Sequence, residues 1–408
     1  MVTFTYGRSI RCQLAADDCT LLGAERVANP PLDDVVGAMR QALARPTGYP
    51  SLAAATAPGD RVAVMVGEGL PQAGVLVRGA LVALEDAGVD LGRVTVVSAG
   101  ELDEQSELAR QFSSTGGGGV QFEKHDPDDQ QRLAMIGVTR AGEPLRLNRT
   151  LAEADFVLPI GLGAMPDGRD EIAGRYGDLY LSFSSRETSH RLHAQAASES
   201  PKQRRKSARQ SDEAGWLAGV AMTVRVVRGA GDGIAAVLAG EPETVAREAA
   251  ERSRLIWERP TDRQGKLVIG AIAGDERQQT WENVAKAIAA ALPLMADDGA
   301  IAVCSELRQP PAGPFKRLKN AVDYGEVSER LAQDDALAAG PARVLAQALD
   351  MGPVYLRSRL PAEVVESLGV TPIDADAELS RLAAARRPCV IIEEAQRLAP
   401  RLVTRVGT

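Results

Sequence analysis

The chain has 408 residues, which exceeds the size at which one hydrophobic core usually keeps growing, so two domains are expected. Hydrophobic residues make up 45% and charged residues 25%, a balance that favours a globular protein with a sizeable core over a disordered chain. The net charge of -8 argues against general nucleic-acid affinity, and no stretch approaches the roughly 18 apolar residues of a membrane-spanning helix.

Short apolar runs typical of buried strands recur along the chain and are separated by helical segments. Between several of them lie Ala-rich stretches with a helical period, such as Ala73–Ala87 and Asn283–Leu294. This alternation predicts an α/β protein with mostly parallel sheets and crossover helices. The predicted strands are Arg61–Val66, Val94–Ser98, Phe156–Ile160, Val220–Val227, Leu267–Ile272, Ile301–Cys304, Val354–Leu356 and Val390–Ile392.

Two polar interruptions suggest how the chain is divided. Residues 194–213 (AQAASESPKQRRKSARQSDE) lack an apolar period, which predicts a flexible surface loop. Residues 258–265 (ERPTDRQG) separate a helix from a strand and are the best domain boundary. We therefore expect a larger domain over residues 1–260 and a smaller one over residues 261–408, with a ligand cleft between them.

Four cysteines, Cys12, Cys19, Cys304 and Cys389, are scattered along the chain without a CxxC pair. This spacing suits a reducing compartment better than a disulfide framework, and it offers no zinc ribbon. Together with an N-terminus that lacks an apolar signal core, it predicts a cytoplasmic protein. The acidic net charge favours a small-molecule or protein partner over nucleic acid, and we expect a small anionic molecule in the cleft with no membrane involved.

The segment from His125 to Ile160 carries the most specific motif of the chain. An HD-P turn is followed by a GVTRAGEP hairpin, an NRTLAEAD helix and an apolar strand that ends at Gly161. This order resembles the first domain of the nickel-dependent lactate racemase family, and weaker likeness extends from about Arg61 to Arg401. The resemblance implies a racemase or epimerase of 2-hydroxy acids, in which a nickel pincer nucleotide accepts a hydride from the substrate.

The motifs expected to carry that family's chemistry are altered here. Leu70 stands where the family has the Arg that grips the substrate carboxylate, and Leu102 stands where it has an acid/base His. Asp167 follows Pro166 where a second His is expected, and no lysine occurs between Lys124 and Lys202 to attach the cofactor. The resemblance therefore implies the nickel pincer nucleotide, but the attaching lysine for it is absent, and true lactate racemisation is not expected.

Three residues keep the type that the family has at its cofactor and substrate. His193 follows Thr188 at the spacing of the family's nickel-ligating His, and imidazole is a suitable nickel ligand. Lys286 and Asn283 occupy the positions of a substrate-side Lys and its neighbouring Gln. Each also has an ordinary structural reading, because a surface lysine or a helix-capping polar residue is common.

Three functions remain open at this point. The chain is a racemase of the family type, a non-catalytic relative that binds a small anion or nucleotide in the cleft, or an enzyme of altered chemistry. In the last case Glu68, Asp167 and Asp178 would do acid/base work where the first sheet's strands end, because open α/β sheets place ligands beyond the carboxyl ends of their strands.

Overall fold

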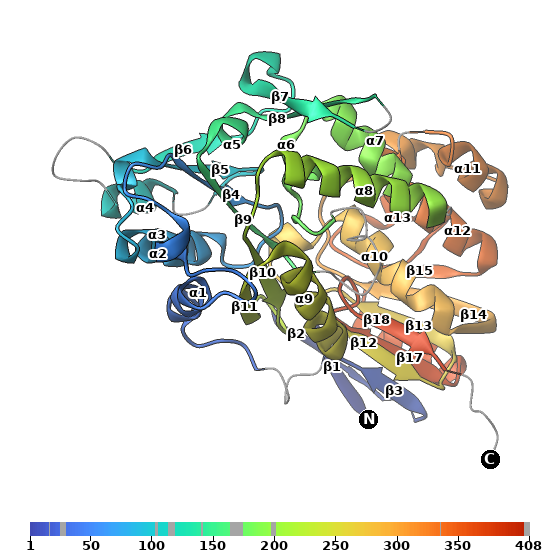
Figure 1. Cartoon of the computed structure of the whole chain (residues 1–408). Helices are drawn as coiled ribbons and strands as arrows, with labels where there is room; N and C mark the ends of the chain where they lie inside the picture. The colour runs from blue at the N-terminus through green and yellow to red at the C-terminus, as the bar shows by residue number, and fades with distance from the viewer. Residues whose placement is uncertain are drawn as a thin grey trace. The chain divides into compact units, whose positions relative to one another are not determined.

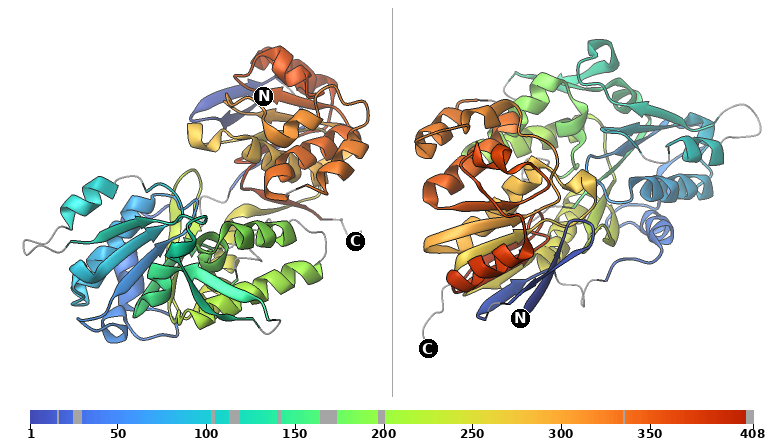
Figure 2. Two further views of the ribbon diagram at one scale, coloured as in Figure 1. Left: turned by 90° about the horizontal axis from the view of Figure 1, so that it is seen from above. Right: turned by 180° about the vertical axis from the view of Figure 1, so that it is seen from behind.

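The computed structural model describes residues 1–15, 17–24, 30–102, 105–112, 119–139, 142–163, 174–196, 201–334 and 336–403. The described chain divides into two compact units, each visible in Figures 1 and 2. Unit 1 comprises Met1–Glu25 and Trp257–Thr408, and unit 2 comprises Arg26–Ile256. The predicted division therefore needs one correction, because the first 25 residues group with the C-terminal part. Within the described ranges, no helix is long and apolar enough to cross a membrane.

In the described part of unit 2, a six-stranded sheet has the order β11-β10-β9-β4-β5-β6. All neighbours pair in parallel except β10 and β11, which are antiparallel. A separate antiparallel hairpin is formed by β7 and β8. The strands are β4 (Val62–Val66), β5 (Val94–Ser98), β6 (Gln121–Lys124), β7 (Leu133–Val138), β8 (Pro144–Asn148), β9 (Phe156–Leu162), β10 (Thr223–Arg228) and β11 (Ile234–Gly240).

Both faces of this sheet are buried, which explains why its strands read as continuous apolar runs. Alternate residues such as Val64 and Leu158 pack with helices α1 and α3 in one cluster, and Met65 and Val157 pack with β8 and helices α6 to α8 in another. The helices of this unit are α1 (Val35–Ala44), α2 (Leu52–Ala55), α3 (Ala73–Asp86), α4 (Gln105–Gln111), α5 (Arg149–Glu153), α6 (Leu179–Phe183), α7 (Arg186–Ala196), α8 (Pro201–Leu217) and α9 (Pro242–Trp257).

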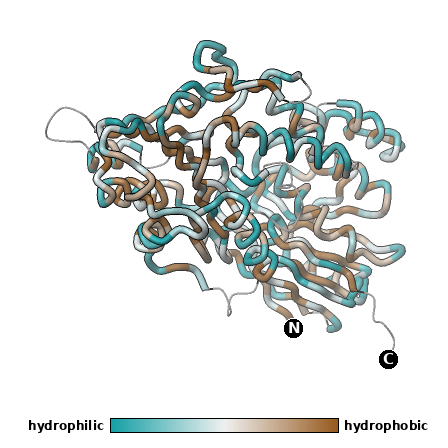
Figure 3. The backbone as a smooth tube through the Cα atoms, viewed as in Figure 1, coloured by the Kyte–Doolittle hydropathy of each residue, from teal (hydrophilic) through white to brown (hydrophobic). Residues whose placement is uncertain are grey.

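Helix α8 shows that the predicted loop over residues 194–213 is wrong for most of its length. The helix runs from Pro201 to Leu217, and its mainly hydrophilic ribbon is visible in Figure 3. Its buried positions fall at a helical spacing, but small or polar residues occupy them: Ser207, Gln210, Ser211, Ala214 and Gly215. Helix α8 therefore has one buried face, but a search for regularly spaced hydrophobic residues does not find it.

Unit 1 contains a second six-stranded sheet among the described residues, with the order β16-β15-β14-β13-β17-β3 and parallel pairing throughout. The hairpin of β1 and β2 packs with α14 against one face, and α10 contacts the strands β13 and β14. A two-stranded sheet of β12 and β18 completes the unit. The strands are β1 (Val2–Tyr6), β2 (Ile10–Leu14), β3 (Cys19–Leu22), β12 (Glu258–Thr261), β13 (Gly265–Ala271), β14 (Met295–Cys304), β15 (Val354–Arg357), β16 (Thr371–Pro372), β17 (Cys389–Glu393) and β18 (Ala399–Leu402).

The α/β prediction is confirmed, and each of the eight predicted strands overlaps a strand of the structure. The two named helix predictions correspond to α3 and to α10 (Trp281–Ala291) with the short turn after it. The remaining helices of unit 1 are α11 (Tyr324–Leu331), α12 (Ala336–Met351), α13 (Ala362–Glu366) and α14 (Asp376–Ala385).

Candidate functional site

The carboxyl ends of β4 and β9 form the place where the sheet of unit 2 reverses its winding order. From β4 the chain passes through α3 to β5 on one side, while β9 and β10 lie on the other. Gly67, directly after β4, donates its backbone N–H to the Ile160 carbonyl at 2.9 Å and so extends the contact between the two strands. Such switch points are where open α/β sheets bind their ligands.

Asp178, just before α6, is an acid at this edge whose pKa departs from its ordinary value. Its Oδ2 atom lies so close to Gly67 that a Cβ added to that glycine would be 3.3 Å away. Although the residue keeps some accessible surface, its carboxyl is surrounded by protein, and this burial raises its pKa above the ordinary value. The charges of Arg225 and His193 act in the opposite direction, and that of Glu68 adds to the rise. Asp178 is thus held in the protonated form to a higher pH than a free aspartic acid.

Arg225 supplies the positive charge with the largest effect on Asp178. It lies on β10, is 5% exposed, and donates from Nη1 to the Leu162 carbonyl and from Nη2 to the Gly174 carbonyl, both at 2.9 Å. Gly177 has φ of +69°, and a Cβ there would lie 2.9 Å from Nη1, so only glycine lets the chain pass over the guanidinium. Sequence reasoning missed this residue, although a single Arg within an otherwise apolar buried strand was the available signal.

His193 lies in α7 and is half-buried, with its charge acting on Asp178. Its Nδ1 atom is 2.8 Å from the Ser189 carbonyl, one helical turn earlier. Because a carbonyl only accepts, Nδ1 carries the hydrogen, and in the neutral ring the lone pair is on Nε2. The nitrogen that could take a proton or a metal is therefore the one turned away from the helix backbone.

The charges of Glu68 and His193, two residues that the sequence also singled out, act on Asp178, as does that of Arg225. Glu68 is exposed in the loop after β4. Asp167, the other predicted acid, lies outside the described residues. Among the described residues, no three His, Cys, Asp or Glu side chains are grouped so that they could hold a metal ion by themselves.

Lys286 and Asn283, predicted at the cofactor, lie on α10 of unit 1 and contact their own helix and the turn before it. The Lys286 ammonium is 2.6 Å from the Glu282 carboxylate, and the Asn283 amide donates to the Gln278 carbonyl at 2.8 Å. These contacts give both residues a structural role, and their part in ligand binding stays a prediction.

The altered motif positions are apolar contacts in the structure. Leu102 is buried in the cluster formed with α1 and α3, and Leu70 packs against the same cluster while partly exposed. Neither can neutralise a carboxylate or carry a proton. These two loops, which in the family hold charged groups, here extend the hydrophobic core to the edge of the sheet.

In contrast, the motif residues that carry the family resemblance hold the scaffold. Buried His125 donates from Nε2 to the Ser184 carbonyl at 3.0 Å, and burial lowers its pKa. Asn148 caps α5 by accepting from Leu151, and its amide donates to Glu123 at 2.8 Å and lies 3.4 Å from His125 Nδ1. These contacts give both residues a structural role.

Arg149 and Asp155 of the same motif also make structural contacts. Arg149 donates to the carbonyls of Gln131 and Leu133 at 3.0 and 3.1 Å, which fastens α5 to the hairpin. Asp155 accepts from the backbone and the guanidinium of Arg61, and these bonds lower its pKa to about 2. This pair joins the start of β4 to the start of β9.

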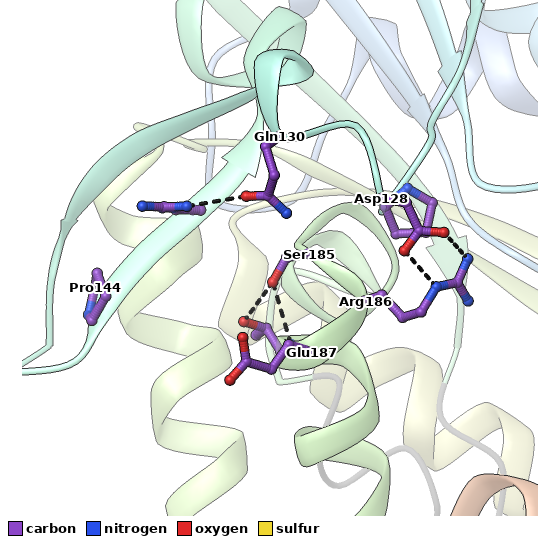
Figure 4. A pocket seen from close by; sticks show the side chains of 9 residues that line it. Asp128, Gln130, Pro144, Ser185, Arg186 and Glu187 are labelled. Carbon is purple, nitrogen blue, oxygen red and sulfur yellow. Dashed lines mark hydrogen bonds and ion pairs between the residues drawn. The ribbon is translucent and has the colours of Figure 1, made fainter.

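A hollow of about 420 Å³ lies at the N-terminus of α7, outside the Asp178 cluster (Figure 4). Three of its charged side chains are already occupied: Arg186 forms two bonds to Asp128 at 2.6 and 2.7 Å, and Arg146 donates to Gln130 at 3.1 Å. The Ser185 hydroxyl donates to Thr188, as the dashed lines show. The hollow is therefore a weaker candidate for the functional site than the Asp178 cluster is.

Comparison with known proteins finds a family match and similar solved structures. Residues 6–164 match the family model described as the lactate racemase N-terminal domain. The chain is therefore similar to the N-terminal domain of lactate racemases over these residues. Its fold is similar to that of the lactate racemase apoprotein from Thermoanaerobacterium thermosaccharolyticum, with a TM-score of 0.75 and 17% identity over 98% of this chain and 99% of that one.

A protein from Thermotoga maritima has a similar fold, with a TM-score of 0.62 and 13% identity over 91% of this chain and 98% of that one. A search of curated proteins found no match. At such identities the two structures establish the fold, and the chemistry has to be argued from the residues themselves.

The side chains of this protein do not fit a covalently attached pincer nucleotide. The segment between Lys124 and Lys202 contains no lysine. Lys124 itself pairs with Glu101, and Lys206 pairs with Glu143 at 3.6 Å. His193 could offer one imidazole to nickel, but the anchoring group for the organic part is missing. We therefore derive no chemical step through that cofactor.

Proposed function

We propose that the chain is an acid–base isomerase that moves a proton on a small anionic substrate of the 2-hydroxy acid class. The observation that carries the proposal is the environment of Asp178, a buried carboxyl at the switch point with Arg225, Glu68 and His193 acting on it. Perturbed acids at the ligand-binding edge of a sheet are candidates for catalytic groups. The substrate class is taken from the family, and the reaction type from the residues.

The proposed reaction inverts the Cα centre by exchanging one proton for another. An ionised Asp178 or a neutral His193 removes the Cα proton, and the other group, in its protonated form, returns a proton to the opposite face. The hydroxyl and carboxylate groups stay on the substrate, so no redox partner is needed. A raised pKa suits Asp178 to this task, because an effective general acid or base titrates near the working pH.

Arg225 offsets the negative charge of the substrate with its guanidinium, which donates to two carbonyls and is held in place by them. Because it is buried, its field is screened less than that of a surface arginine, and it favours the extra negative charge that develops when a Cα proton leaves. In this proposal Arg225 is a positioning residue that acts through Asp178.

The source of the Cα hydrogen distinguishes this mechanism from hydride transfer. In deuterium oxide, proton exchange through Asp178 and His193 places deuterium at Cα, whereas a hydride that leaves and returns keeps the original hydrogen. We would incubate single enantiomers of several 2-hydroxy acids with the protein and analyse the products by chiral chromatography and mass spectrometry. Inverted product with deuterium is expected, and inverted product without deuterium would refute the mechanism.

Asp178→Asn gives the matched mutational test. We expect it to lower the rate by about 100-fold or more, the usual contribution of a general acid or base. Asn should fold well there, because burial already disfavours the ionised carboxylate. Asp86→Asn is the control, since Asp86 makes an exposed ion pair with Arg40 at 2.7 Å on α1 and α3. Equal activity of the two variants would contradict the role of Asp178.

A non-catalytic protein that binds a small anion is the second candidate. Leu70 and Leu102 favour it, because they replace the family's charged groups with apolar contacts. Under this alternative no enantiomer is converted, but a carboxylate ligand such as lactate still raises the unfolding temperature of the wild type and not of Asp178→Asn. Conversion of any substrate by the wild type would exclude it.

A further inference from the structure

The four cysteines that are scattered in the sequence come together in one hydrophobic cluster of unit 1. Cys389 begins β17, and Cys19 begins β3, the strand at the edge of the sheet. The two residues are direct register partners in a parallel pair. Both belong to the cluster in which Cys12 and Cys304 are also buried. None of this pairing can be read from the spacing of the cysteines.

Register partners in adjacent strands point to the same face of the sheet, so the two thiols are neighbours. Strands lie about 4.8 Å apart, which is inside the range of Cα separations that disulfides span. The backbone holds this alignment, because Cys389 donates its N–H to the Asp18 carbonyl at 3.1 Å. Side-chain contact between the thiols also contributes to the raised pKa of Cys389.

Access differs between the two thiols. Cys389 is 1% exposed, whereas Cys19 is partly exposed at the sheet edge. Cys12 and Cys304, in contrast, are both wholly buried, and burial raises the pKa of Cys12 to about 12. A reagent from solution can therefore reach the Cys19 and Cys389 pair through Cys19, but it cannot reach the other two.

We propose that Cys19 and Cys389 form a dithiol oxidation site that takes a low-molecular-weight disulfide such as glutathione disulfide. The Cys19 thiolate attacks one sulfur of the reagent, which forms a mixed disulfide and releases one glutathione thiolate. The Cys389 sulfur, once deprotonated, then attacks Cys19 and releases the second. Two protein thiols are oxidised, and one glutathione disulfide is reduced to two glutathiones.

The second step is the slow one at neutral pH. Burial and the neighbouring Cys19 raise the pKa of the Cys389 thiol, so its thiolate is scarce until the pH rises. The mixed disulfide on Cys19 therefore accumulates at lower pH and closes to the internal disulfide at higher pH. The closed bond fastens the edge strand β3, and with it the start of the chain, to β17.

The test uses the full-length protein treated with glutathione disulfide and then digested without reduction. Mass spectrometry should find a peptide that contains Cys19 linked to one that contains Cys389, in a fraction that rises with pH. Cys389→Ala should stop at glutathionylated Cys19, and Cys19→Ala should form neither product. Cys12→Ala, the matched control in the same cluster, should react like the wild type.

Two results would overturn the proposal. One is a wild type that stops at glutathionylated Cys19 at every pH, and the other is a linked peptide that involves Cys12 or Cys304. Phenylarsine oxide, which bridges two close thiols without oxidation, gives an independent reading. It should protect Cys19 and Cys389 together from alkylation in the folded wild type, and protection of neither would equally refute their proximity.

Discussion

Asn148 offers the sharpest test of the conclusion that the family motif in this chain serves the scaffold. The side chain is wholly buried, caps α5 through Leu151 at 3.2 Å and donates to Glu123 at 2.8 Å. Loss of a helix cap costs about 1 kcal/mol, and loss of a hydrogen bond to a charged group costs about 2 kcal/mol. Asn148→Ala should therefore lower the free energy of unfolding by about 3 kcal/mol.

A second variant separates the two contributions. Asn148→Ser keeps an oxygen that can cap the helix but cannot reach Glu123, so it should cost about 2 kcal/mol. The Glu123 carboxylate keeps its 2.6 Å bond from Thr150 in both variants, which prevents a larger loss.

Urea unfolding followed by circular dichroism measures both differences. Hydrogen exchange of peptides from α5 and β8 shows whether unit 2 is the part affected, since the two units can unfold separately. Losses below about 0.5 kcal/mol for both variants would refute the scaffold role, because surface substitutions produce changes of that size. Loss of isomerase activity with unchanged stability would assign Asn148 to catalysis instead.

The remaining predictions concern His125, which holds the scaffold, and Leu102, which stands where the family has an acid/base His. Burial lowers the pKa of His125 in the folded protein, so its imidazole is protonated more readily in the unfolded chain. The free energy of unfolding therefore decreases as the pH falls below about 6.5, the ordinary pKa of histidine. Thermal unfolding between about pH 7.5 and 5.5 should thus depend less on pH in His125→Gln than in the wild type, and equal slopes would contradict this. Leu102→His alone should yield no interconversion of D- and L-lactate and a lower unfolding temperature, because it places an imidazole in the buried α1 and α3 cluster. Racemisation by that variant, measured by chiral chromatography, would show that one histidine suffices.

Sequence reasoning predicted the strands well because both sheets are covered on two faces, so that each strand is a continuous apolar run. β5 was located at both ends, Val94 and Ser98, and β15 and β17 within two residues. Helix α8 was missed for the opposite reason, since Ser207, Ser211 and their neighbours fill its buried face with polar atoms.

The site was only partly accessible from the sequence. Glu68, Asp178 and His193 were recognised as candidates by their place after strands or by family spacing. In the structure the charges of Glu68 and His193 act on Asp178, and the catalytic role of the three residues stays a prediction. Arg225 was not predicted, because it lies inside an apolar strand and because the chain passes over its guanidinium only at Gly177, which is distant in sequence. Neighbours across a sheet, such as Cys19 and Cys389, are separated by most of the chain, and no local pattern connects them.

The discontinuous make-up of unit 1 has a consequence for how the protein is made. Because the ribosome synthesises the chain from its N-terminus, β1, β2 and β3 emerge first, yet the strands they pack against follow only after residue 257. Unit 2 is complete at Ile256, directly before those strands, and can fold while the rest of unit 1 is still being synthesised. Until synthesis nears its end, the apolar face of the first hairpin, with Phe4 and Leu14, lacks its native partners and is open to binding by a chaperone.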